Sequence, residues 1–177
     1  MSSKPKFFRR VIHESPLLPD FIAGSVIDID IAVLQSLHIG CMLLDIDDTL
    51  MERRGDEFAP AIIQHLGRIR ESGIELVMGS NTNRDITALA NSIQARVVEK
   101  GTRHFKPTKR FFRRILATIE LPPDRVMMVG DRVINDVVGA NRSGVQTILV
   151  EPVERHLGWH SQRYRAYLMR HSVQATS

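Results

Sequence analysis

Short apolar runs alternate with segments of helical periodicity along most of the chain. The run Cys41-Met42-Leu43-Leu44 is continuous, which is typical of a strand covered on both faces in a parallel sheet. By the same pattern, further strands are predicted over 74–78, 96–98, 126–129 and 145–150. Apolar periodicity, with proline and glycine at the boundaries, predicts helices over 60–71, 84–93, 108–119 and 133–141. This alternation indicates right-handed crossovers and a parallel sheet with helices on both faces.

The two ends of the chain have a different pattern. The first residues are basic and contain proline, so we expect a loosely held arm over 1–16. A basic helical tail is expected over 154–177, after Pro152 has broken the last strand. The part between them, 17–153, is expected to form one domain, because 177 residues leave little room for a second core.

Composition and charge narrow the classes of protein to consider. Cys41 is the sole cysteine, which excludes an intramolecular disulfide and thiolate zinc clusters. The sequence has neither an apolar run that could cross a bilayer nor a signal peptide, so we expect a cytoplasmic protein, at most peripheral to a membrane. A net charge of +4 and a pI of about 9.6 favour an anionic partner such as nucleic acid, anionic lipid or a phosphorylated metabolite. On charge alone, a merely solvated basic surface is slightly the better explanation.

Acidic residues follow two of the predicted strands. Asp45 and Asp47 are two residues apart, so in an extended segment their carboxylates project to the same side. Asp131 and Asp136 follow the strand at 126–129, and Gly130 permits close backbone approach. Each pair alone fits a helix N-terminus, but ligands of parallel sheets bind at the carboxyl ends of the strands. Two such ends with acids favour a shared site for a hard cation such as Mg²⁺.

Three more polar residues occupy positions where a phosphoryl group could bind. Ser80 and Asn81 follow the strand at 74–78 and could offer a hydroxyl and N–H groups. Lys106, fixed by Pro107 before a helix, could supply positive charge to the acids and to a phosphate. Taken singly, these residues also fit an ordinary helix cap and a surface lysine.

The order of these motifs resembles the haloacid-dehalogenase (HAD) superfamily. Asp-x-Asp-x-Thr at 45–49, Ser80, Lys106 and Gly-Asp-x-x-x-x-Asp at 130–136 match its four motifs in sequence. Leu-Leu-Pro-Asp at 17–20 and the segment 139–150 extend the resemblance to the YqeG branch of subfamily IIIA, over roughly 17–153. That branch is similar to the mitochondrial phosphatidylglycerophosphate phosphatases of fungi and plants. The resemblance implies a Rossmannoid three-layer α/β/α sandwich with a central parallel sheet and a minimal cap or none.

The resemblance also implies a role for each motif residue. Asp45 is expected to be the nucleophile that forms an aspartyl-phosphate, and Asp47 the general acid and base. Mg²⁺ is expected to bind Asp45, the backbone carbonyl of Asp47 and Asp131, with Asp136 acting through water. Ser80, Asn81 and Lys106 are expected to bind the phosphoryl group, and Thr49 to brace the loop. The branch often has Asn at the position of Asp48 and an uncharged residue at that of Arg132, so substrate preference could differ.

The short gaps between motifs bear on the substrate. Only 32 residues separate Asp47 from Ser80, and the gap from Lys106 to Asp131 is similarly short, so neither holds a large cap domain. An open site suits a bulky ester, and the branch resemblance favours phosphatidylglycerophosphate at a membrane surface. Aromatic residues beside arginines, as at Phe111-Phe112, are typical of membrane-surface segments. A buried helix stripe explains that pair better, whereas the tail with Trp159 and its other aromatic residues is the stronger candidate for lipid contact.

Three alternatives remain open at the level of sequence. Basic patches would also serve a phosphatase of nucleic-acid ends, although no known nucleic-acid-binding module is present. A soluble phosphometabolite is a third substrate class. A scaffold that binds magnesium or phosphate without catalysis is the alternative outside the enzymes, and the presence of every expected catalytic group argues against it.

Overall fold

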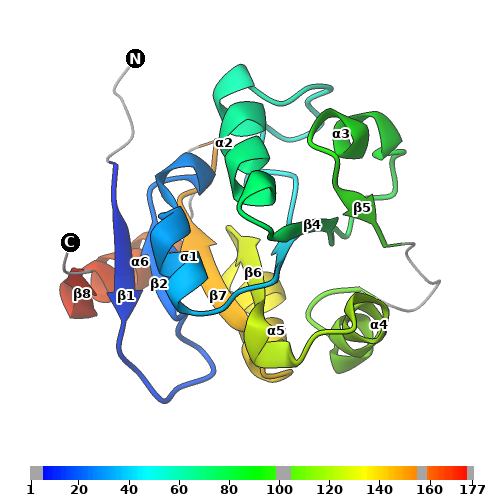
Figure 1. Ribbon diagram of the computed structural model, residues 1–177. Helices are drawn as coiled ribbons and strands as arrows, with labels where there is room; N and C mark the ends of the chain where they lie inside the picture. The colour runs from blue at the N-terminus through cyan, green and yellow to red at the C-terminus, as the bar shows by residue number, and fades with distance from the viewer. Residues whose placement is uncertain (1–5, 99–104, 155–158, 175–177) are drawn as a thin grey trace.

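The computed structural model describes residues 6–98, 105–154 and 159–174. Within these ranges eight strands form one sheet in the order β5-β4-β3-β6-β7-β2-β1-β8 (Figure 1). The strands are β1 Phe8–Val11, β2 Phe21–Ala23, β3 Cys41–Leu44, β4 Glu75–Met78, β5 Arg96–Val97, β6 Val126–Gly130, β7 Gln146–Val150 and β8 Ser172–Gln174.

The centre of the sheet is parallel, as the continuous apolar runs predict. β3 lies between β4 and β6, so that Leu43 is opposite Val77 on one side and Met128 on the other. β7 continues the parallel part from β6 to β2, and only β1 runs antiparallel to its neighbours β2 and β8. The carboxyl ends of β3, β4 and β6 therefore meet at one edge of the sheet, where the motif residues follow.

The four predicted helices are present in the predicted order, the last one as a π-helical segment followed by a short α-helix, and α1 is an additional helix that was not predicted. The helices are α1 Ile31–Ser36, α2 Pro60–Glu71, α3 Thr87–Ser92, α4 Lys109–Ile119, α5 Gly139–Asn141 and α6 Trp159–His171, with a π-helical segment, η3, at Val133–Val138. α2 begins at Pro60, whose missing N–H costs nothing in the first turn. α4 begins after Thr108, whose side chain accepts a hydrogen bond from the Phe111 N–H.

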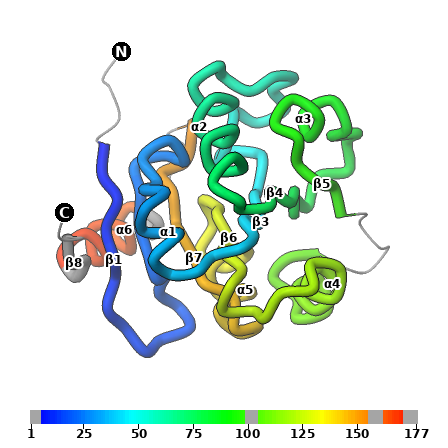
Figure 2. Tube along the Cα trace, viewed as in Figure 1, coloured from blue at the N-terminus to red at the C-terminus, as the bar shows by residue number. Residues whose placement is uncertain are grey.

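Apolar side chains alternate between the two faces of the sheet and form a core on each. On one face, Leu44 and Met127 pack in a cluster with Leu34 of α1 and Leu66 of α2. On the other face, Leu43, Val77 and Met128 pack with residues of α4 and α5. Figure 2 shows α1 and α2 on one side of the central strands, with α4 and α5 on the other. The molecule is the three-layer α/β/α sandwich expected.

Both ends of the chain add strands that the hydrophobic pattern did not predict. Residues 8–11, expected in a loosely held arm, form β1, and Phe8 stacks on Phe21 with ring centroids 5.2 Å apart. The tail forms α6, as expected, and then β8, which pairs with β1 (Figure 1). The arm prediction was wrong for 8–11, because pairing with β2 and β8 gives this short basic segment its backbone partners. The domain boundaries at 16 and 153 stay predictions.

Burial decides between two interpretations of the aromatic residues. Phe111 and Phe112 are buried in α4, at 6% and 0% exposure, so they belong to the core and not to a membrane-facing surface. In the tail, Leu168 is buried, and the Tyr164 hydroxyl donates a hydrogen bond to the Leu17 carbonyl. The Trp159 side chain lies outside the described residues. In the part of the chain that the structure describes, no helix combines the length and apolar character needed to span a membrane.

Candidate active site

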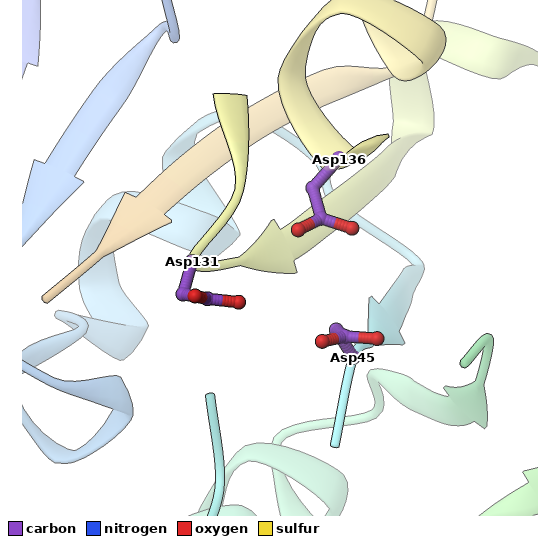
Figure 3. Close-up of side chains that lie close together, drawn as sticks. All are labelled: Asp45, Asp131 and Asp136. Carbon is purple, nitrogen blue, oxygen red and sulfur yellow. The ribbon is translucent and has the colours of Figure 1, made fainter. Parts of the chain in front are cut away.

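Three carboxylates converge at the carboxyl edge of the sheet. Asp45 follows β3, Asp131 follows β6, and Asp136 lies in η3 just beyond (Figure 3). Each offers an oxygen, and these oxygens lie within 4.8 Å of one another. Among the described residues, this is the group of acids arranged to hold a metal ion. β3 and β6 are hydrogen-bonded neighbours, which is why acids 86 positions apart in the sequence meet here.

A buried lysine joins two of these carboxylates. The Lys106 Nζ donates hydrogen bonds of 2.6 Å to Asp45 Oδ1 and 2.6 Å to Asp136 Oδ1, and the lysine is 3% exposed. Its backbone is held by Asn81, whose side chain accepts from the Lys106 N–H at 2.8 Å and donates to the Lys106 carbonyl at 3.1 Å. Asn81, expected to bind phosphate, thus fixes the position of the lysine that faces the acids.

Burial and mutual repulsion shift the acid–base equilibria of the cluster. Burial, followed by the nearby charges of Asp136 and Asp45, raises the pKa of Asp131 to about 7. Burial also raises the pKa of Asp136 to about 6, although the Lys106 ammonium opposes this shift. Burial lowers the pKa of Lys106, but Asp136 and Asp45 outweigh it and the net direction is upward. One ammonium therefore does not compensate the three acids.

The chemistry of these donors fits a hard divalent cation. Carboxylate oxygens are the ligands that Mg²⁺ prefers, and a second positive charge would relieve the repulsion that Lys106 leaves. Lys106 contacts one oxygen of Asp45 and one of Asp136, so the remaining oxygens and Asp131 are the candidate ligands. The Asp47 side chain is outside this group.

Close backbone approach and a threonine shape the cluster. A Cβ at Gly130 would lie 2.3 Å from the carboxylate of Asp136, so only glycine lets the end of β6 approach η3 this closely. The Asp136 Oδ2 accepts the Arg132 N–H at 3.0 Å, which closes the turn. Thr49 Oγ1 lies 3.4 Å from both Asp45 Oδ2 and Asp131 Oδ1, in agreement with a bracing position between the two strand ends.

Asp47 lies at the other side of the site, in an ion pair that the motif analysis missed. Its Oδ1 accepts hydrogen bonds from Arg84 Nη2 at 3.1 Å and from the Arg54 N–H at 3.4 Å. Arg84 also donates to the Gly55 carbonyl at 2.7 Å. The sequence carried no signal for this pair, because Arg84 stands in a polar stretch that fits an ordinary helix approach.

An open pocket of about 280 Å³ lies between the two groups of contacts. Asp45, Asp47, Ser80, Asn81, Lys106 and Asp136 line it, as expected from the motifs. Its other lining residues are Arg132, which the comparison with the branch had singled out, and four that motif analysis missed: Arg53, Arg54, Thr82 and Asn135. The Ser80 Oγ accepts the Thr82 N–H at 3.3 Å, which orients the loop after β4 beside Lys106.

The C-terminal helix also reaches the site. Arg165 of α6 donates hydrogen bonds of 2.9 Å to the carbonyls of Asp131 and Val150, and its Nη1 lies 3.0 Å from Glu151 Oε1. With 10% of its side chain exposed, Arg165 is a buried link between the tail and the turn that presents Asp131. The sequence indicated only that it belongs to the basic helical tail expected over 154–177.

Comparison with known proteins agrees with the motifs and the fold. The HAD-hydrolase-like family model matches residues 105–156. The curated protein "Probable phosphatase YqeG" of Bacillus subtilis is 29% identical over 137 residues, which cover 77% of this chain and 78% of that protein. Over most of its length, the chain is therefore similar to HAD-like phosphatases.

Solved structures show the same HAD-like fold. A predicted phosphoglycolate phosphatase from Haemophilus somnus aligns with a TM-score of 0.52 at 13% identity, over 71% of this chain and 92% of that one. An uncharacterized protein from Listeria monocytogenes aligns with a TM-score of 0.51 at 18% identity, over 67% and 85%. At these identities the likeness concerns the fold, and the chemistry of the site depends on this chain's own residues.

Proposed function

We propose that the protein is a Mg²⁺-dependent phosphomonoester hydrolase that acts through an aspartyl-phosphate on Asp45. The observation that carries this proposal is the convergence of Asp45, Asp131 and Asp136 on Lys106 beside an open pocket. Carboxylates crowded around a buried ammonium suit a site where a cation and a phosphoryl group bind together.

Two displacements make up the proposed reaction. A carboxylate oxygen of Asp45 bonds to phosphorus while the ester P–O bond breaks, and Asp47 gives its proton to the leaving oxygen. Asp47 then takes a proton from water, whose oxygen attacks phosphorus, breaks the acyl-phosphate bond and releases inorganic phosphate. Lys106, Ser80 and backbone N–H groups would hold the phosphoryl oxygens. A bound Mg²⁺, with Asp45, Asp131 and Asp136 as its candidate ligands, would supply charge stabilisation for the phosphoryl group.

For the substrate we propose an anionic phospholipid with a terminal phosphomonoester, such as phosphatidylglycerophosphate. Arginines 53, 54 and 132 line the pocket around the phosphoryl site, and the side chains of Arg54 and Arg132 are exposed. Their charge suits a second anionic group beyond the phosphate that is hydrolysed, as a phosphodiester in a lipid headgroup provides. Phe105 and Ile134, at 51% and 68% exposure, are next in sequence to pocket residues and suit contact with an acyl boundary.

The proposal is tested by phosphate release from three substrate sets in Mg²⁺ and in EDTA. These sets are vesicles that contain phosphatidylglycerophosphate, oligonucleotides phosphorylated at the 5′ or 3′ end, and a panel of soluble phosphometabolites. Turnover of vesicles in Mg²⁺ supports the full proposal. Fast turnover of a soluble ester or an oligonucleotide, with vesicles ignored, would reject the lipid substrate but keep the phosphatase chemistry.

The covalent step has its own test in Asp45→Asn. We expect this variant to lose at least about 1,000-fold in turnover, because the amide cannot form the aspartyl-phosphate. Its midpoint of thermal unfolding should not fall, since the substitution removes one charge from three crowded acids. Substantial turnover by a folded Asp45→Asn protein would rule out Asp45 as the nucleophile.

A further inference from the structure

Arg84 connects the loop after β4 with the loop that carries Asp47. Its Nη1 donates to the Gly55 carbonyl at 2.7 Å, and its Nη2 lies 3.1 Å from Asp47 Oδ1 and 3.6 Å from the Met51 sulfur. The Arg84 Nε is buried and has no hydrogen-bond partner among the described residues. An arginine placed only for stability would be expected to satisfy that N–H, because a buried donor without a partner destabilises the fold.

The contacts of Asp47 distinguish its two carboxylate oxygens. The Arg84 and Arg54 donors both reach Oδ1, and in the described part of the chain no hydrogen bond is found at Oδ2. Asp47 lines the pocket, whereas Arg84 is not one of the lining residues. A proton on Oδ1 would point at two N–H donors. A proton that moves to and from substrate must therefore sit on Oδ2.

We propose that Arg84 is a positioning residue that holds Asp47 by Oδ1 and so leaves Oδ2 as the oxygen that exchanges the proton with the leaving group. This inference rests on the proposed function, in which Asp47 is the general acid and base. The planar guanidinium suits the task because it spans Asp47 and the Gly55 carbonyl at once. The side chains of Arg84 and Asp47 are 25% and 32% exposed, so the ion pair itself adds little to stability.

A pair of esters with different leaving groups tests the proposal. 4-Nitrophenyl phosphate releases a stable anion and needs little help from a general acid, whereas glycerol phosphate releases an alkoxide that must be protonated. We expect Arg84→Gln to lower kcat/KM for glycerol phosphate at least about 10-fold more than for 4-nitrophenyl phosphate. Arg84→Lys keeps the charge but cannot span both acceptors, so it should recover part of the loss.

Asp47→Asn and the double variant complete the test. Asp47→Asn should show the same selective loss, and the double variant should lose no more than Asp47→Asn alone, because both substitutions remove one function. Equal losses for the two esters, or losses that multiply in the double variant, would overturn the positioning role. If circular dichroism shows that Arg84→Gln does not fold, the two esters are compared with Arg84→Lys instead. Equal losses for both esters in that variant would also overturn the proposal.

Two further results separate this inference from the proposed function. Arg96→Gln removes another ion-paired arginine, 2.7 Å from Glu75 at the edge of the sheet, and should change neither ester's kcat/KM. A wild-type protein that hydrolyses neither these two esters nor any substrate of the three sets above would contradict the proposed function. The inference alone would be contradicted by a different result. In that case the wild-type enzyme is active and Asp47→Asn loses kcat/KM selectively for glycerol phosphate, but Arg84→Gln does not.

Discussion

At the scale of single residues, the site depends on groups whose positions are restricted by close contact. Lys106 is held through its side chain by two acids and through its backbone by Asn81, so its buried ammonium is fixed beside the pocket. Asp48 has φ of +63°, a backbone region in which Asp and Asn are the best tolerated of the non-glycine residues. Its carbonyl accepts the Val153 N–H, which connects the loop after β3 to the chain after β7.

Gly130 gives a prediction at this scale. Gly130→Ala places a methyl group 2.3 Å from the Asp136 carboxylate, so β6 and η3 must separate. We expect the free energy of unfolding to fall by about 1–3 kcal/mol, measured by urea denaturation. Gly67→Ala in α2 is the matched control, since its Cβ would meet nothing within 4 Å, and it should add about 0.5–1 kcal/mol. Equal stability of the two variants would show that the close approach at Gly130 is not required.

At the scale of elements, α6 is part of the construction of the site. The helix packs Leu168 against Val11, Ile22 and Leu149, so it covers the sheet beside η3. From that position Arg165 binds the carbonyl of Asp131. The tail that sequence suggested as a membrane-binding segment is thereby committed, at Arg165 and Leu168, to contacts with the sheet and its carboxyl edge.

Arg165→Gln tests this connection. The variant leaves the carbonyls of Asp131 and Val150 without their donor, and we expect a loss of about 2 kcal/mol in the free energy of unfolding. The concentration of Mg²⁺ that gives half of the thermal stabilisation should also rise, because the Asp131 turn is less well held. Arg170→Gln removes the same charge from an exposed position of the same helix and should change neither quantity. A Mg²⁺ response identical to wild type would limit Arg165 to a structural role.

At the scale of the whole molecule, the fold brings several acids together, and this lowers the free energy of unfolding by an amount that depends on pH. The raised pKa of Asp131, about 7 against an ordinary value of 3.8, means that the metal-free folded protein binds a proton more tightly than the unfolded chain. This carboxyl therefore contributes stability that is complete below about pH 4 and is lost as the pH rises through about 7. Asp136 acts in the same direction through about 6.

The pH dependence of unfolding, with and without Mg²⁺, is the corresponding prediction. In EDTA, deprotonation of these acids should lower the unfolding temperature by several degrees between pH 5.5 and pH 8. Mg²⁺ should raise the unfolding temperature more at pH 8 than at pH 5.5, because at pH 8 the metal ion does not compete with protons for the carboxylates. Asp131→Asn mimics the protonated acid, so in EDTA at pH 8 it should unfold at a higher temperature than wild type, with a smaller response to Mg²⁺. A wild-type stability that does not respond to Mg²⁺ at pH 8 would argue against the metal site.

Some features of this protein could be predicted from its sequence, and others only the tertiary structure shows. The run at 41–44 predicted the central strand, and the acids after it predicted one edge of the site, because periodicity and strand ends are local properties. The motif order predicted the resemblance to the HAD superfamily, which comparison with known proteins confirmed. Three contacts could not be predicted in this way. They are the pairing of β1 with β8, the hydrogen bond from Arg84 to Asp47 and the hydrogen bond from Arg165 to the Asp131 carbonyl. In the sequence, these segments and arginines look like parts of an ordinary basic surface. Their partners are distant along the chain, so only tertiary packing brings each strand and each arginine to its acceptor.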